Sequence, residues 1–189
     1  MTHMQWQLLF VSIPPVIAFV AFSRVGTLSE AVLGAIVVSG FELIYNSLQL
    51  GFVEPFSLCS LVLFVGFGAV SFRRNDDRYF KLQPVAFEIC VAATLDYFVV
   101  VLDTPLLAVL AEDYIGIHAS LEAYQRGYAT IYATTLSRSM PVLLVVHAAL
   151  TARAAWKRST CVWFNVRVFG FYGMVALLFL AERLLGVTP

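Results

Sequence analysis

Eight ionisable side chains lie within or at the edges of long apolar stretches of this 189-residue chain. They are Glu30, Glu42, Glu88, Asp96, Asp103, His147, Arg167 and Glu182. Inside a bilayer such groups are costly, so they usually pair with one another or line a path for ions, protons or polar headgroups. These side chains are therefore the first candidates for chemistry.

Three of the acids recur along one stretch. Glu88, Asp96 and Asp103 are spaced by 8 and 7 residues, which on a helix places them within an arc of about 80°. One interpretation is a path for a cation, a proton or a polar headgroup. The structural alternative is that the acids sit at helix ends or pair with bases on neighbouring helices. Only Asp96 must lie deep, which favours the structural alternative.

Basic partners for these acids are available elsewhere in the chain. Arg138 could reach Asp103, and Arg167 could reach Glu88. Two deep acids, Glu42 and Asp96, could share a proton or remain neutral. The candidate intramembrane polar site therefore comprises Glu42, Glu88, Asp96, Asp103, Arg138 and Arg167.

Other catalytic patterns find no support in the sequence. His147 stands alone in LLVVHAAL, so a buried hydrogen-bonding role is expected rather than haem ligation. No serine occurs in a G-x-S-x-G context. The cysteines Cys59, Cys90 and Cys161 are isolated, without a CxxC or Cys/His motif. We predict no catalytic residue, metal or cofactor, and therefore no enzyme.

The composition and the lengths of the apolar runs predict which secondary-structure elements carry these side chains. The chain is 60% hydrophobic and 13% charged, with a mean hydropathy of +0.85, outside the usual range of soluble domains. Its apolar runs are each about 17–25 residues long, enough to cross about 30 Å of hydrocarbon as a helix. Because backbone amides in lipid must be satisfied within the segment, we predict an all-α polytopic membrane helix bundle. Residues 1–189 form a single transmembrane domain in this interpretation.

Five to six transmembrane helices are expected, over residues 7–22, 28–50, 55–72, 82–104, 140–156 and 164–185. The first run carries Pro14 and Pro15 in its middle, so it either crosses with a kink or only dips into the bilayer.

The segment 119–138 is amphipathic, and we expect one interfacial helix there. The alternative is that it forms the outer half of a longer fifth span. In the interfacial interpretation, Ser139 caps the fifth span and Pro141 lies in its first turn.

Basic residues set the orientation, since short cytoplasmic loops retain Lys and Arg. Eight of the twelve bases fall on one side when six spans are counted: Arg24, Arg73, Arg74, Arg78, Lys81, Arg153, Lys157 and Arg158. Loops 73–81 and 153–160 are therefore predicted to be cytoplasmic. The C-terminus is predicted to be periplasmic.

Two motifs resemble a known family. Residues 75–84, NDDRYFKLQP, are similar to a loop reading approximately H-D-E-x-F-I-K-W-K-P in the intracellular septation protein A family, also called the inner membrane-spanning YciB proteins. The retained positions are Asp76, Asp77, Lys81 and Pro84. A second motif, W-x-N-F-K-V-F-G, resembles residues 163–170, with Trp163, Asn165, Arg167, Phe169 and Gly170. The resemblance covers about residues 8–104 and 160–185, and little of 105–159, so we interpret the chain as a divergent member.

The resemblance implies a non-enzymatic multi-pass protein of the bacterial inner membrane that supports cell-envelope integrity, septation and elongation. Expected partners are membrane phospholipids and membrane proteins of the envelope or of division and elongation; a homo-oligomer is left open, and no nucleic acid is expected. The alternative, from another class, is a small transporter or lipid-handling protein that uses the acidic face of the fourth span.

Overall fold

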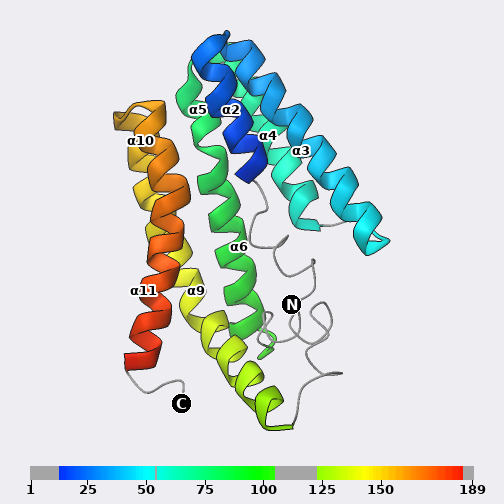
Figure 1. The fold of residues 1–189 in the computed structure, drawn as a ribbon, viewed down its shortest axis with the longest axis vertical. Coiled ribbons are helices and arrows are strands. Elements are labelled where there is room, and N and C mark those ends of the chain that lie inside the picture. The colour runs from blue at the N-terminus through cyan, green and yellow to red at the C-terminus, as the bar shows by residue number, and fades with distance from the viewer. Residues whose placement is uncertain (1–12, 54, 105–122, 185–189) are drawn as a thin grey trace. The chain divides into compact units, whose positions relative to one another are not determined.

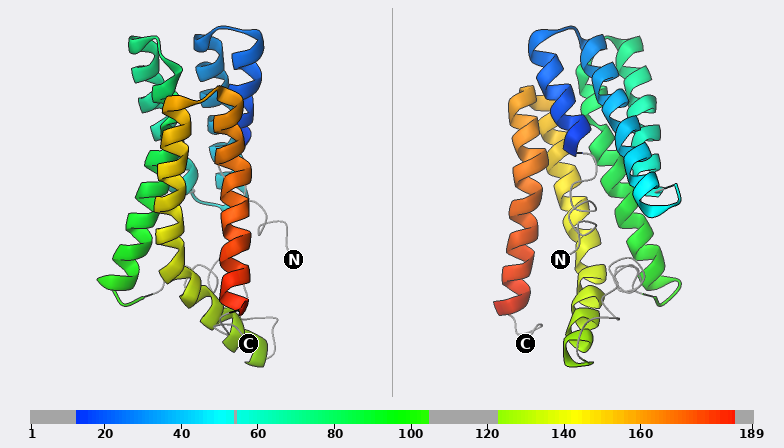
Figure 2. Two further views of the ribbon diagram at one scale, coloured as in Figure 1. Left: turned by 90° about the vertical axis from the view of Figure 1, so that its left-hand side faces the viewer. Right: turned by 45° about the vertical axis from the view of Figure 1, so that its right-hand side comes forward.

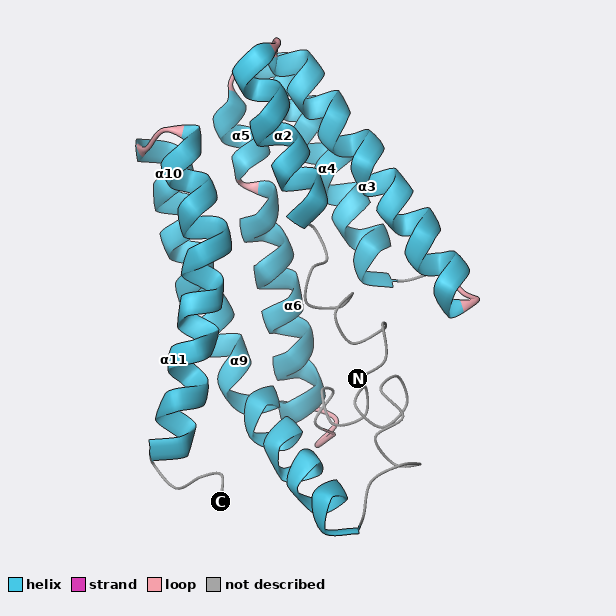
Figure 3. Ribbon diagram, in the orientation of Figure 1, coloured by secondary structure: helices cyan, strands magenta, loops and turns pink. Residues whose placement is uncertain are grey.

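The computed structural model describes residues 13–53, 55–104 and 123–184. Within these ranges the chain is helical, with turns between helices and no strand (Figure 3). The helices are α2 (Ile13–Val25), α3 (Leu28–Leu50), α4 (Pro55–Arg74), α5 (Asp77–Lys81), α6 (Gln83–Val100), α9 (Ala123–Lys157), α10 (Thr160–Asn165), the π-helix η1 (Val166–Gly170) and α11 (Phe171–Leu184).

Five helical stretches in the described ranges are long and apolar enough to cross a membrane: Leu28–Gln49, Pro55–Arg74, Asp77–Val100, Leu136–Lys157 and Thr160–Leu178. A shorter apolar helix precedes them at Ile13–Val25. The predicted all-α membrane bundle is therefore confirmed.

The described parts of residues 1–87 and 149–169 form one compact unit, and those of residues 88–148 and 170–189 form a second. The first unit has an aromatic core in which Phe80 stacks on Phe19, with ring centroids 4.4 Å apart. Phe64 lies 5.5 Å from Phe80, and Trp163 packs edge-on against Phe19. The second unit has a smaller core of buried residues, Ala92, Leu95 and Leu144.

The first two helices pack side by side (Figures 1 and 2). Thr27 and Glu30 form a capping box at the start of α3: the Thr27 backbone N–H donates to Glu30 Oε2 at 2.6 Å, and the Glu30 N–H donates to Thr27 Oγ1 at 3.3 Å. Gly34 allows close packing, because a Cβ atom there would lie 2.6 Å from the Phe22 ring.

The prolines of the first apolar run lie at the N-terminal end of the described part of α2. Pro14 and Pro15 are the second and third residues of α2, and proline is tolerated in the first turn of a helix. With 13 residues, α2 is about 20 Å long, shorter than the hydrocarbon thickness. Residues 7–12 lie outside the described ranges, so a crossing of this segment stays a prediction.

The fifth span does not begin at Ser139. The helix α9 continues from Ala123 through Pro141 to Lys157 without a break, so the predicted N-cap is wrong, and the alternative of a longer helix describes this part of the chain. Pro141 lacks only one N–H donor, and membrane helices tolerate this loss where neighbouring groups satisfy the freed carbonyl. Residues 119–122 lie outside the described ranges.

Two other boundaries differ from the sequence prediction. The fourth span is expected to reach Thr104, but α6 ends at Val100, and Asp103 follows in a left-handed conformation with φ 48°. The last span begins at Thr160, since Ser159 caps α10 by accepting a hydrogen bond from the Val162 N–H.

Candidate functional site

The loop between α4 and α6 contains the short helix α5, which is stabilised by two aspartates of the loop. Asp76 caps α5 by accepting a hydrogen bond from the Arg78 N–H at 2.9 Å. Asp77 lies one helical turn from Lys81, and its carboxylate pairs with the Lys81 ammonium at 2.5 Å. The side chain of Lys81 is buried, with 4% exposure, and that of Asp77 is 38% exposed. Burial of a lysine requires such a partner, so Asp77 stabilises the fold of this loop.

The last span reaches the same loop from far along the chain. The Trp163 indole N–H donates to the Lys81 carbonyl oxygen at 3.1 Å, and Trp163 is fully buried. The Thr160 hydroxyl donates to Asp77 Oδ2 at 3.5 Å. The two sequence motifs therefore meet in one cluster, which we call the loop cluster: Asp76, Asp77, Lys81, Thr160 and Trp163.

The second motif also contains an irregular helix. Residues Val166–Gly170 form a π-helix between α10 and α11. This places Arg167 and Phe169 in a wider helical turn than an α-helix has, an arrangement frequent at functional sites. Arg167 is half-buried and Phe169 is 67% exposed.

A second polar cluster lies within the second unit. His147 Nδ1 lies 3.0 Å from both carboxyl oxygens of Glu88. Both residues are buried, at 0% and 2% exposure, and the Phe171 ring packs edge-on against the imidazole at 5.4 Å. This contact joins the fourth span to the fifth through an ionisable pair.

The comparison with protein families settles the relationship that the two motifs suggest. The model of the family named intracellular septation protein A matches residues 7–186. The chain belongs to the intracellular septation protein A family. Searches of curated proteins and of solved structures found no match.

The family match is wider than the resemblance seen in the motifs. It runs through residues 105–159, where little correspondence is visible in the sequence. Together with the apolar helices, membership of the septation family identifies a multi-pass membrane protein of septation.

The residues of the two motifs differ in position and burial in this septation-family protein. Asp76, Asp77, Lys81 and Trp163 form the loop cluster, and Pro84 is buried in the first turn of α6. Asn165 is exposed, and Gly170 is half-buried at the end of the π-helix. Sequence reasoning did not identify Thr160, for which no local pattern gives a signal.

The three acids expected on one face of the fourth span lie in different surroundings. Glu88 is buried against His147, whereas Asp96 is exposed and Asp103 lies beyond the end of α6. An angular separation of about 80° between Glu88 and Asp96 is enough to turn one toward the core and the other away. The His147 partner of Glu88 is also absent from the sequence prediction, which expects no obvious membrane partner for this histidine.

The remaining site predictions have separate outcomes. Arg138 and Asp103 are both exposed, and no ion pair joins them among the described residues. Glu42 is half-buried on α3, with its Oε2 atom buried. An Arg167–Glu88 contact and proton sharing between Glu42 and Asp96 stay predictions. No group of three or more His, Cys, Asp or Glu that could hold a metal occurs in the part of the chain that the structure describes.

Proposed function

We propose that this protein supports septation, elongation and envelope integrity at the bacterial inner membrane as a non-enzymatic multi-pass protein. In this proposal the end of the first unit that carries the loop cluster faces the cytoplasm and binds anionic phospholipid headgroups together with membrane proteins of division or elongation. The septation family is not a known enzyme family, which supports a role through contacts.

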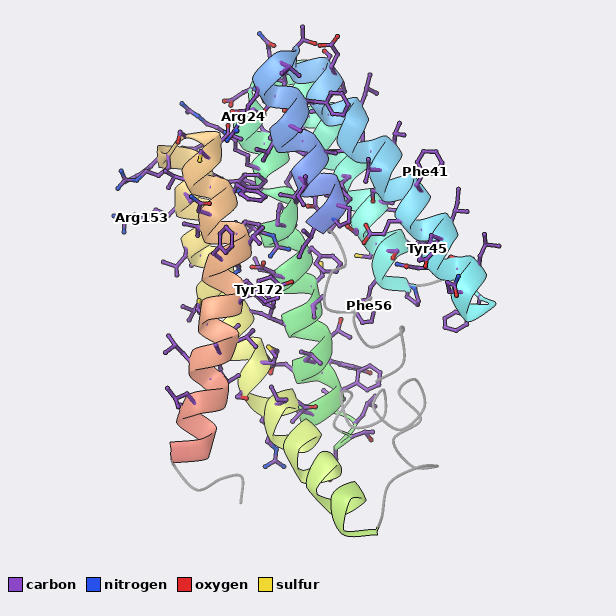
Figure 4. The ribbon with its side chains drawn as sticks, viewed as in Figure 1. Arg24, Phe41, Tyr45, Phe56, Arg153 and Tyr172 are labelled. Carbon is purple, nitrogen blue, oxygen red and sulfur yellow. The ribbon has the colours of Figure 1, made fainter. Side chains whose placement is uncertain are left out.

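The observation that carries the proposal is the charge at this end. Seven of its eight bases are exposed, while Lys81 is buried: the exposed ones are Arg24, Arg73, Arg74, Arg78, Arg153, Lys157 and Arg158. Figure 4 shows the side chain of Arg153 pointing away from its helix. Juxtamembrane bases attract anionic headgroups by about 1 kcal/mol each.

The acids at the same end are engaged in local contacts. Glu30 completes the capping box, Asp76 caps α5, and Asp77 pairs with Lys81. These contacts fix the carboxylates in the fold and leave most of the exposed bases for external partners. Arg78 also lies over the half-exposed Trp156 ring, at 6.0 Å from its centroid, as is common at a membrane interface.

The experiment that tests the proposal is crosslinking in cells from two matched aromatic positions. A photoreactive phenylalanine analogue replaces Phe72, exposed beside Arg73 and Arg74, or Tyr97, exposed near the opposite end of α6. Mass spectrometry then identifies captured proteins and lipids. We expect position 72 to capture anionic phospholipid and division or elongation proteins, and position 97 not to capture those proteins.

The control for this experiment removes charge without changing the fold. In the variant Arg73→Gln/Arg74→Gln/Lys157→Gln/Arg158→Gln, capture from position 72 should fall, because headgroup attraction depends on these bases. Equal capture from positions 72 and 97, or capture from position 72 that survives neutralisation, would contradict the proposal.

The transport alternative receives less support from the geometry. It requires a continuous acidic face on the fourth span, but Asp96 is exposed, and Asp103 lies outside the helix. The Glu88–His147 contact supplies a buried ionisable pair, which by itself fits a structural link between two spans.

A further inference from the structure

The first unit has an unusual distribution of polarity along its helices. Near the loop cluster, the buried face of α3 is apolar, with Ala31, Val32 and Ala35 at 0% exposure. Further along the same face, the buried or half-buried side chains become polar: Ser39, Glu42 and Asn46. These positions follow one another at three- and four-residue spacing, so they share one side of the helix.

The helix α4 is antiparallel to α3 and runs back toward the loop cluster. Its buried side chains also become polar toward the α3–α4 turn. Phe64 and Gly68 are buried in its middle, and Ser57 and Ser60 are buried nearer the α3–α4 turn. Ser71, at the end near the loop cluster, is also buried, but its hydroxyl donates to the Asp76 carbonyl oxygen at 2.6 Å. The Asn46 amide donates to Ser57 Oγ at 2.9 Å, so the two polar faces meet. We call Ser39, Glu42, Asn46, Ser57 and Ser60 the polar seam.

Two more buried polar residues, Gln83 and Thr151, lie about one helical turn along the chain from residues of the core. Gln83 follows Phe80 by three residues, and Thr151 precedes Ala155 by four. Phe80 and Ala155 belong to the same core cluster as Ala35 and Phe64, from which Ser39 and Ser60 are each four residues distant. By this spacing, α3, α4, α6 and α9 each carry one buried polar side chain about one helical turn from a residue of that core cluster.

Several of these polar atoms lack a hydrogen-bond partner in the part of the chain that the structure describes. They are Ser39 Oγ, Thr151 Oγ1, Gln83 Nε2 and Gln83 Oε1, and the three residues are 0–1% exposed. An amide and two hydroxyls buried without partners would cost several kcal/mol, so native proteins satisfy such groups with ordered water.

The outer surface of α3 has the opposite character. Val37, Phe41 and Tyr45 are 54%, 67% and 54% exposed, and Figure 4 shows Phe41 pointing away from the helix. An apolar exterior around a polar interior is the pattern of membrane segments that enclose water.

We propose that the first unit is a water-binding vestibule, in which water enters at the α3–α4 turn, follows the polar seam and hydrogen-bonds Gln83 and Thr151. The aromatic core of Phe19, Phe64, Phe80 and Trp163 closes it toward the loop cluster. The vestibule keeps Glu42 in contact with water inside the membrane. This inference does not depend on the lipid and protein contacts proposed above.

Cysteine accessibility tests the vestibule directly. In a background of Cys59→Ala/Cys90→Ala/Cys161→Ala, single cysteines replace Ser39 or Ser60, changes that nearly conserve side-chain volume. The matched controls are Val37→Cys and Val62→Cys, on the same helices but on exposed apolar faces. The probe is an anionic methanethiosulfonate reagent, applied to membrane vesicles of each orientation, because it reacts with hydrated thiolates and not with thiols in lipid.

We expect cysteines at positions 39 and 60 to react at least about tenfold faster than their controls, since only hydrated thiols ionise. The fast reaction should occur from the side of the α3–α4 turn. A rate at position 39 or 60 no faster than its control, or a fast reaction only from the side of the loop cluster, would overturn the vestibule. If either serine variant fails to fold, Thr151→Cys against the exposed Leu150→Cys carries the same comparison.

Discussion

Glu88 and His147 are two ionisable side chains that meet in the interior of the second unit. His147 Nδ1 lies 3.0 Å from each carboxyl oxygen of Glu88, and both side chains are buried. Loss of one partner would remove this hydrogen bond from the other buried side chain, which costs more than replacing both by apolar groups. At the residue scale, this pair is a structural link between two spans.

We predict that Glu88→Leu and His147→Leu each lower the free energy of unfolding by about 1–3 kcal/mol. The double variant should lose less than the sum of the two, with a coupling of about 0.5–3 kcal/mol. The measurement is unfolding of the purified protein in mixed detergent micelles. Asp96→Leu, on the exposed face of the same helix, is the control and should not lower stability; additive losses from Glu88→Leu and His147→Leu would show that the pair contributes no coupling.

At the scale of elements, glycines set how closely neighbouring helices approach. A Cβ atom at Gly68 would lie 2.9 Å from Val32 Cγ1 and 3.3 Å from Ile36 Cδ1 on α3, whereas a Cβ atom at Gly66 would meet nothing within 4 Å. In lipid, helices associate largely by such close packing. The two glycines lie two residues apart on one helix, but only Gly68 is required by the α3–α4 contact.

We therefore predict that Gly68→Leu lowers the free energy of unfolding by about 1–3 kcal/mol, because the larger side chain pushes α3 and α4 apart. Gly66→Leu is the matched control, with an expected change within about 0.5 kcal/mol. Thermal unfolding of both variants in the same detergent measures the difference. Similar losses for the two variants would mean that helix propensity, and not the contact with α3, determines the effect.

At the scale of the whole molecule, orientation in the membrane follows from charge. Cys161 is exposed at the start of α10, three residues beyond the exposed Arg158. Basic loops are retained in the cytoplasm, so the thiol of Cys161 should be accessible from that side only.

In a Cys59→Ala/Cys90→Ala background, we predict that a membrane-impermeant maleimide labels Cys161 in inside-out vesicles and not in intact spheroplasts. Gel-shift detection of the labelled protein measures this, and Cys161→Ser should abolish the signal. Labelling in spheroplasts alone would reverse the predicted orientation and place the basic end in the periplasm.

Several features of this protein are determined by local sequence. The all-α membrane architecture follows from the length of the apolar runs, and the bounds of α3, Leu28–Leu50, match residues 28–50 as predicted. The position of Thr27 and Glu30 gives the capping box, and the bases at residues 73–78 mark one end of the bundle. Each of these features depends on neighbours a few residues apart, whose hydrophobicity and charge are visible in the chain.

The tertiary structure alone decided which side chains meet. Trp163 bonds the carbonyl oxygen of Lys81 across 82 residues, and His147 reaches Glu88 across 59. The hydrophobic pattern identifies each span but does not say which spans pack against each other, because every face of an apolar helix is compatible with lipid. Which faces pack together depends instead on shape, such as the space left by Gly68, and on buried hydrogen bonds between distant residues.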